Sequence, residues 1–133
     1  MKYISGIHAL NLPCQLKTTG DWHTSAIQWD VPTVYDSNDS IWGEWGIEPN
    51  HFVPNQTSKW FVANHIRACL DMLAKGDFSN LQGMRDDYIC CDEYTPFIFD
   101  KVKSLQNSPL WKKIDSFMEK EYKMQWVRFR EAI

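Results

Sequence analysis

The stretch of sequence that decides the fold class is residues 58–76, SKWFVANHIRACLDMLAKG. Serine is favoured at helix N-caps, and glycine often ends a helix in the left-handed conformation. Ser58 and Gly76 therefore predict the two ends of a helix. Between them, mostly apolar residues recur at spacings of three and four and would form one buried face: Phe61, His65, Ala68, Cys69, Met72 and Leu73.

Helical signals continue toward the C-terminus. The pairs Thr95-Pro96 and Ser108-Pro109 each place a hydroxyl N-cap before a proline, which fits the first helical position because no N–H is needed there. We expect the second pair to start a helix that runs from Pro109 almost to the C-terminus. Its apolar seam would consist of Trp111, Ile114, Met118, Tyr122, Trp126 and Phe129. A weaker helical pattern covers residues 78–91.

The first third of the chain favours strands instead. Residues 2–12 and 22–29 are rich in side chains that suit strands, and two shorter runs follow at 33–35 and 41–47, separated by turn-forming residues. The sequence therefore predicts an α+β fold in a single domain of residues 1–133. A small N-terminal antiparallel sheet would be followed by about three to four helices packed on it.

Composition and charge narrow the functional classes. Apolar residues make up 44% of the chain and charged residues 23%, as in ordinary globular proteins. The net charge of -3, with both signs interspersed, provides no positive field for a phosphate backbone and argues against nucleic-acid binding. There is no signal-peptide pattern, no apolar run long enough for a membrane span and no Cys-x-x-Cys spacing. We therefore expect a cytoplasmic protein with reduced thiols and no membrane association.

The most concentrated reactive side chains are His8, Cys14, Asp21 and His23. Their spacing does not match known zinc motifs, so no metal or other cofactor is expected. His8, Asp21 and His23 are candidate catalytic residues, because a carboxylate can orient a histidine for proton transfer near neutral pH. The alternative is structural: His8 would be satisfied by hydrogen bonds within the sheet, and Asp21 would form a turn with Gly20.

Two further sets of reactive side chains have structural interpretations. His65 lies on the apolar stripe of its predicted helix, which favours a core histidine. Cys90 and Cys91 precede Asp92 and Glu93, and acidic surroundings oppose thiolate formation. We therefore expect no cysteine nucleophile at that pair.

Tryptophan is unusually frequent, with seven residues in the chain. The segment WGEWG at positions 42–46 alternates large rings with glycine, which would place both rings on a local surface. Tryptophan is enriched in binding hot spots because it supplies a large rigid area and one hydrogen-bond donor. The residues expected to bind a partner or ligand are Trp22, Trp42, Trp45 and Trp60. Ordinary packing against the helices is the alternative for each ring.

The chain resembles a family of small, uncharacterised bacterial proteins in three segments. These are ISGIHAL at positions 4–10, GDWH at 20–23 and ANHIRA at 63–68. Such proteins are encoded in accessory regions, in some cases beside toxin–antitoxin-like genes with ADP-ribosyltransferase-type toxins. The resemblance implies a bacterial cytoplasm and a role in interaction, and it supplies no catalytic residues.

Two functional hypotheses follow. The first is a non-enzymatic cytoplasmic interaction protein, such as an antitoxin or an accessory component of a toxin–antitoxin-like operon, which contacts a protein partner through residues 42–60. Acidic neighbours favour a protein over a nucleic acid there: Asp36, Asp39, Glu44 and Glu48. The second is a small enzyme or a domain that binds a small, nucleotide-like molecule in a pocket around His8, Asp21, Trp22 and His23.

Overall fold

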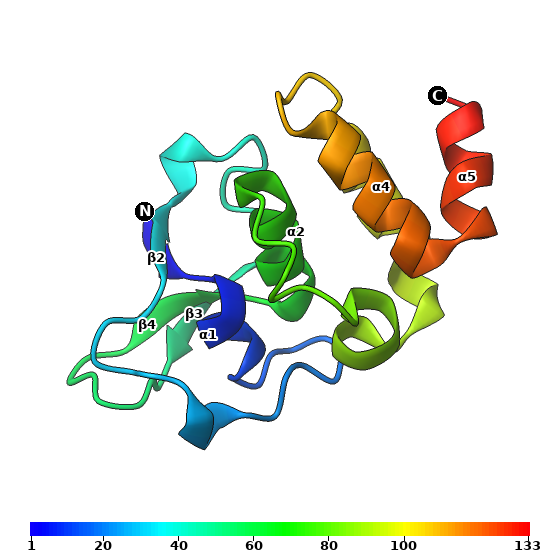
Figure 1. Ribbon diagram of the computed structural model, residues 1–133. Helices are drawn as coiled ribbons and strands as arrows, with labels where there is room; N and C mark the ends of the chain where they lie inside the picture. Colours follow the sequence, from blue (N-terminus) through cyan, green and yellow to red (C-terminus); the bar gives the residue numbers. More distant parts are fainter.

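The computed structural model describes residues 1–133 and contains a four-stranded sheet with helices beside it (Figure 1). The strands lie in the order β2-β1-β4-β3. Their bounds are Lys2–Ile4 for β1, Val34–Asp36 for β2, Ile47–His51 for β3 and Trp60–Ala63 for β4. The α+β prediction is confirmed. The sheet is mixed, however, because β1 pairs in parallel with β4, whereas the other two pairings are antiparallel.

Strand β4 occupies the residues that were expected to begin the central helix. Trp60, Phe61 and Val62 are aromatic or β-branched and suit a strand, and β4 pairs with β1 on one side and β3 on the other. The N-cap is Asn64 rather than Ser58, since its side chain accepts a hydrogen bond from the Arg67 N–H at 2.8 Å. Helix α2 then spans His65–Lys75.

The predicted C-terminal end of α2 is confirmed. Gly76 has φ 79°, in the left-handed region where a side chain would be strained. Its N–H donates to the Leu73 carbonyl, and the Asp77 N–H donates to the Met72 carbonyl. These two bonds satisfy carbonyls that the helix itself leaves free.

The strand predicted over residues 2–12 ends early. After β1 the chain forms the short helix α1, Gly6–Leu10. Gly6 has φ 62°, outside the strand region, and a Cβ there would meet the Thr33 side chain at 3.4 Å. The change of direction places α1 against α2.

Two of the other three predicted strands, over residues 22–29 and 41–47, are also largely absent. Residues 22–29 contain only the 3₁₀ turn η1, Thr24–Ala26, and the Trp29 indole N–H donates back to the Thr24 carbonyl at 2.8 Å. Residues 41–47 form turns, and only Ile47 joins β3. Gly43 and Gly46 both have positive φ, which bends this loop away from a strand path. The short prediction over 33–35 is confirmed by β2.

Four α-helices follow the strands, in agreement with the expected number. After α2 come α3 (Thr95–Lys103), α4 (Trp111–Tyr122) and α5 (Met124–Glu131). Helix α3 starts at Thr95-Pro96 as expected, but Thr95 is its first residue and Tyr94 its N-cap. Helix α4 begins just after the pair Ser108-Pro109, with Leu110 as its N-cap, so neither hydroxyl is the N-cap that the sequence predicted. Within the weak pattern over 78–91 lies a single π-helical segment, η3, Met84–Ile89. In Figure 1, α2 separates the sheet from α4 and α5. None of the helices is both long and apolar enough to cross a bilayer.

The long C-terminal helix is split at Lys123, between α4 and α5. Lys123 has φ 55° and ψ -129°, a conformation that glycine adopts far more readily than other residues. We expect Lys123→Gly to raise the free energy of unfolding by about 1 kcal/mol, because it removes this strain. Chemical denaturation measures the change. Lys120→Gly, inside α4, is the matched control and is expected to lower stability by about 1 kcal/mol; equal losses for both variants would contradict the argument.

Candidate functional site

His8, the first predicted catalytic residue, is buried in α1 with both ring nitrogens engaged. Its Nδ1 accepts the Thr33 backbone N–H at 3.1 Å, so the proton lies on Nε2, which donates to the Gln28 carbonyl at 2.7 Å. The ring also packs edge-on against Trp29, with centroids 5.1 Å apart. His8 therefore connects α1 to residues 28–33 and has no free nitrogen for proton transfer.

Asp21 and His23 belong to a second hydrogen-bond network, at the C-terminal end of α1. Asp21 Oδ1 lies 2.9 Å from His23 Nδ1, and Asp21 Oδ2 accepts from the Asn11 side chain at 3.0 Å. Asn11 Oδ1 in turn accepts the His23 backbone N–H at 2.6 Å. The hydrogen bond to Asp21 raises the pKa of the exposed His23. This network shares no side chain with that of His8, so the structure does not bring the three candidates together.

Trp22 lies between these paired residues and is strongly exposed. Its exposed fraction is 80%, and its φ of 58° is rare for an aromatic residue. The residues on both sides are fixed, because the Asp21 N–H donates to the Leu10 carbonyl at 2.8 Å and His23 is held by Asn11. We call Asp21, Trp22 and His23, with Asn11 beneath them, the Trp22 turn. The hydrogen bonds of Asp21 and His23 fix the backbone of this turn, so that Trp22 keeps its strained φ and its ring lies in solvent.

The other three tryptophans expected to bind a partner are covered to different degrees. Trp42 is only 9% exposed, and its indole N–H donates to the Lys101 carbonyl at 3.3 Å. Trp45 is half-buried beneath the Lys101 ammonium, which lies 4.5 Å from the ring centroid. Trp60 in β4 is also half-buried. Of the four rings, only Trp22 projects freely into solvent.

The inward position of residues 42–46 depends on Arg67 of α2, whose side chain is fully buried. Its guanidinium donates to the Gly43 carbonyl at 2.8 Å and to the Trp45 carbonyl, and it also donates to Asp71 Oδ1 at 3.0 Å. Asp71 accepts further hydrogen bonds from Tyr3 and Ser5, each at 2.7 Å. Sequence reasoning did not predict this buried pair, although a spacing of four residues between Arg67 and Asp71 on a helix was a usable signal.

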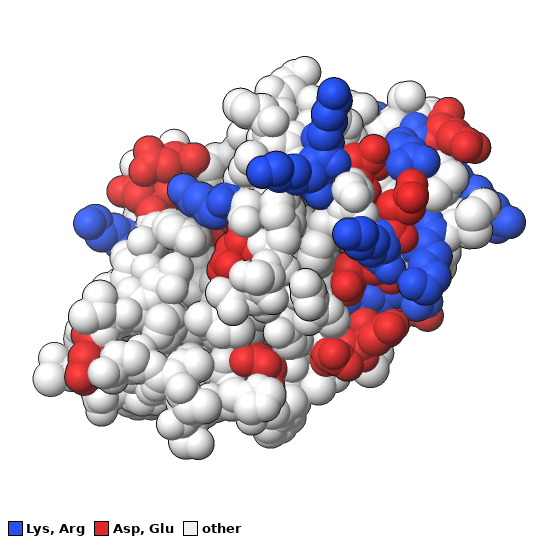
Figure 2. Space-filling model, in the orientation of Figure 1, with Lys and Arg blue, Asp and Glu red and all other residues white.

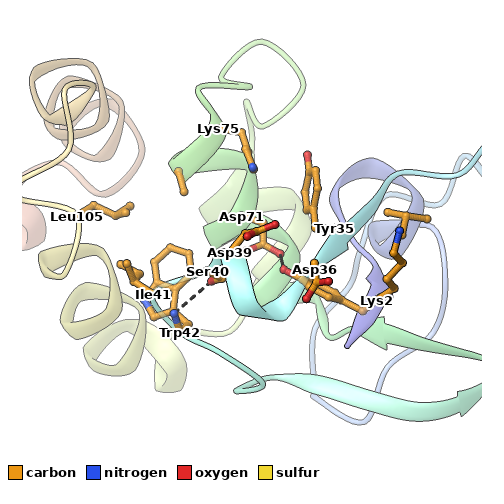
Figure 3. A pocket seen from close by; sticks show the side chains of 13 residues that line it. Lys2, Tyr35, Asp36, Asp39, Ser40, Ile41, Trp42, Asp71, Lys75 and Leu105 are labelled. Atoms are coloured by element: carbon orange, nitrogen blue, oxygen red, sulfur yellow. Dashed lines mark hydrogen bonds between the residues drawn. The ribbon is translucent and has the colours of Figure 1, made fainter.

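The same region borders one of the two main pockets, with a volume of about 500 Å³. Figure 3 shows Tyr35 and Trp42 on opposite sides, with Asp71 between them. The buried polar groups of its floor, Tyr3 and Asp71, are already bonded to each other. The second main pocket lies beside α4 and includes Phe78. Neither pocket is lined by His8 or by a residue of the Trp22 turn.

Charge is unevenly distributed over the visible surface. Figure 2 shows lysine, arginine and acidic side chains gathered over α4 and α5, while the area over α1, β3 and β4 carries few charges. Val31, in the loop before β2, and Phe52, in the loop between β3 and β4, are each 80% exposed. Their loops touch, since the Asn55 side chain donates to Asp30 Oδ1 at 2.9 Å. The charge-poor half of the protein thus carries exposed apolar side chains.

No group of three or more histidine, cysteine, aspartate or glutamate side chains is placed to hold a metal ion. Comparison with known proteins gives no match: no family model fits the chain, and no similar curated protein or solved structure was found.

Proposed function

We propose that this protein is a non-enzymatic interaction protein that binds a protein partner through the Trp22 turn. The observation that carries the proposal is the combination of 80% exposure and positive φ at Trp22. Backbone strain of this kind costs about 1–3 kcal/mol and persists where surrounding contacts enforce it, often at binding sites. A tryptophan whose backbone is already fixed loses less conformational entropy on association than one on a flexible loop.

The surroundings of the Trp22 turn favour a protein as the partner. Residues 5–35 include only three charged side chains, Lys17, Asp21 and Asp30, so this region offers no phosphate-binding surface. Exposed tryptophan is typical of protein interfaces, where it is enriched among the residues that contribute most to binding. The resemblance of the sequence to proteins from accessory regions supports a cytoplasmic role as an antitoxin or accessory component of a toxin–antitoxin-like operon. The loop at 42–46 then has a structural role and does not contact the partner, since Arg67 binds its backbone.

A comparative capture experiment tests this function. The tagged full-length chain and its Trp22→Ala variant are expressed in the source cells, and bound proteins are quantified by mass spectrometry. We expect the partner's recovery to fall about tenfold or more in Trp22→Ala, the size of effect that removal of a hot-spot tryptophan causes. Phe97→Ala is the matched control, because Phe97 is also an exposed aromatic residue, at 64%, but belongs to α3.

Two outcomes of that experiment would count against the proposal: equal recovery with Trp22→Ala, or equal loss with Phe97→Ala. Circular dichroism of the purified variants checks that both are folded. Because Trp22 is highly exposed, its removal is expected to change stability by no more than about 0.5 kcal/mol.

The second candidate function is a small enzyme or a small-molecule-binding domain at the same turn. The observation that favours it is the Asp21–His23 pair, an imidazole oriented by a carboxylate at 2.9 Å and open to solvent. Such a pair can donate or accept a proton near neutral pH. His23→Gln separates the two functions: catalysis would be lost, whereas partner capture through Trp22 would continue.

A further inference from the structure

Cys14, Thr18 and His65 form a chain of polar contacts that does not involve the Trp22 turn. Cys14 Sγ lies 3.4 Å from Thr18 Oγ1, and Thr18 Oγ1 lies 2.7 Å from His65 Nδ1. Cys14 and Thr18 are half-buried on the loop after α1, while His65 is the buried first residue of α2. A partly accessible thiol is thus linked through one hydroxyl to an imidazole.

The contacts of His65 determine the orientation of its ring and which ring nitrogen carries the proton. Nε2 lies 2.7 Å from the Leu12 carbonyl, which can only accept a hydrogen bond, so Nε2 carries a proton. Nδ1 is then the acceptor for the Thr18 hydroxyl, which in turn can accept from the Cys14 thiol. Gly20 packs closely on the ring, since a Cβ there would lie 2.8 Å from His65 Cε1. The imidazole is therefore held ready to take a proton from Cys14 through Thr18.

The charged surroundings favour the thiolate–imidazolium form of the pair. Burial alone would raise the pKa of the Cys14 thiol, but interactions with His65 and Thr18 outweigh it and lower the pKa. Burial likewise disfavours the His65 imidazolium, yet its interactions with Cys14 and with the Leu12 carbonyl raise its pKa, helped by the nearby Glu48 carboxylate.

The neighbouring elements contribute the other groups that face this loop. Glu48 of β3 is buried, accepts the Gln15 N–H at 2.8 Å and is bonded to His51 at 2.8 Å. The Tyr94 hydroxyl accepts the Lys17 N–H at 3.0 Å. Glu48 is the buried carboxylate of this set, and its negative charge supports a cation on His65.

We propose that Cys14, linked by Thr18 to His65, is an activated thiol that small hydroperoxides oxidise to a sulfenic acid. The thiol proton passes through Thr18 to His65. The Cys14 sulfur then attacks one peroxide oxygen, so that a sulfur–oxygen bond forms and the oxygen–oxygen bond breaks. Sulfur is oxidised, the peroxide is reduced, and the departing hydroxide or alkoxide takes the proton from His65 and leaves as water or as an alcohol.

Hydrogen peroxide is the probe, with dimedone to trap sulfenic acid and peptide mass spectrometry to assign it. The protein itself holds three comparison thiols: Cys90 is exposed, Cys91 is half-buried and Cys69 is fully buried. At pH 6.5 we expect Cys14 to be trapped roughly tenfold faster than Cys90, because the thiolate is the reactive form. Cys69 should remain unmodified, since burial raises the pKa of its thiol.

The pH profile separates activation from mere accessibility. The rate at Cys14 should rise through a midpoint below the ordinary thiol range near 8.5. Thr18→Val removes only the bridging hydroxyl and should move that midpoint upward and slow trapping at pH 6.5 about fivefold or more; His65→Gln should do the same. If Cys14 reacts no faster than Cys90, or if Thr18→Val, confirmed as folded by circular dichroism, leaves rate and midpoint unchanged, the proposal is wrong.

Discussion

Replacing Arg67 by methionine is expected to lower the free energy of unfolding by roughly 3–5 kcal/mol, the usual effect of removing one partner of a buried ion pair. The physical reason is the burial of its partners. Asp71, only 4% exposed, would keep a carboxylate without its cation, and the carbonyls of Gly43 and Trp45 would lose their donor. Small domains are stable by about 5–15 kcal/mol, so this single change approaches complete unfolding.

Urea denaturation followed by circular dichroism measures the effect of Arg67→Met. Arg128→Ala, at an exposed position on α5, is the control and should stay within about 0.5 kcal/mol of the unmodified chain. Adding Asp71→Leu to Arg67→Met should recover part of the loss, because no unpaired charge then remains in the core. A loss below about 1 kcal/mol for Arg67→Met would show that the loop at 42–46 does not depend on this guanidinium.

Trp126→Ala is expected to have an effect of similar size in the C-terminal helices, roughly 3–5 kcal/mol. Trp126 is fully buried on α5 and contacts Phe99 and Phe129, with ring centroids 5.2 and 5.5 Å apart. Its indole N–H also donates to Asp115 of α4 at 2.7 Å. Truncation would therefore leave a cavity between α3 and α5 and remove the hydrogen bond that joins α5 to α4.

Thermal unfolding compares Trp126→Ala with two other variants. Trp126→Phe keeps an aromatic ring but loses the bond to Asp115, so a smaller loss of about 1–2 kcal/mol is expected. Met124→Ala, on the same helix but 56% exposed, should have little effect. Losses of equal size at Trp126 and Met124 would mean that α5 is not held by this aromatic packing.

Several elements of the fold were predictable because local residues decide them. Gly76 ends α2 through its own positive φ, and the Thr95-Pro96 pair lies at the start of α3. The Asn64 cap was missed because Ser58 offered the same chemistry six residues earlier, and local capping rules alone do not choose between them. Burial was less predictable: Trp42 and Trp45 look alike in the sequence, but Trp42 is buried whereas Trp45 is only half-buried.

In the candidate site, too, local features were predictable and distant contacts were not. The GDWH segment was predicted as a site because it combines a turn, a carboxylate, a tryptophan and a histidine. The pairing of Asp21 with His23 depends only on their closeness in sequence. That His8 lies in a separate network could not be inferred, since its partners Gln28 and Thr33 reach it only after the chain folds back. His65 was interpreted as a core histidine, and its burial agrees, but its link to Cys14 through Thr18 was not predictable.

By itself, the sequence determined the α+β class, the end of α2 at Gly76 and the start of α3 near Pro96, because composition and the backbone preferences of glycine and proline act over a few neighbouring residues. Only the tertiary structure decided that β4 is a strand, that Arg67 is buried, that Trp22 is the exposed tryptophan of its set and that Cys14 meets His65. Each of these depends on contacts between segments distant in the chain. Such contacts arise from the packing of one hydrophobic core and leave no periodic pattern in the sequence.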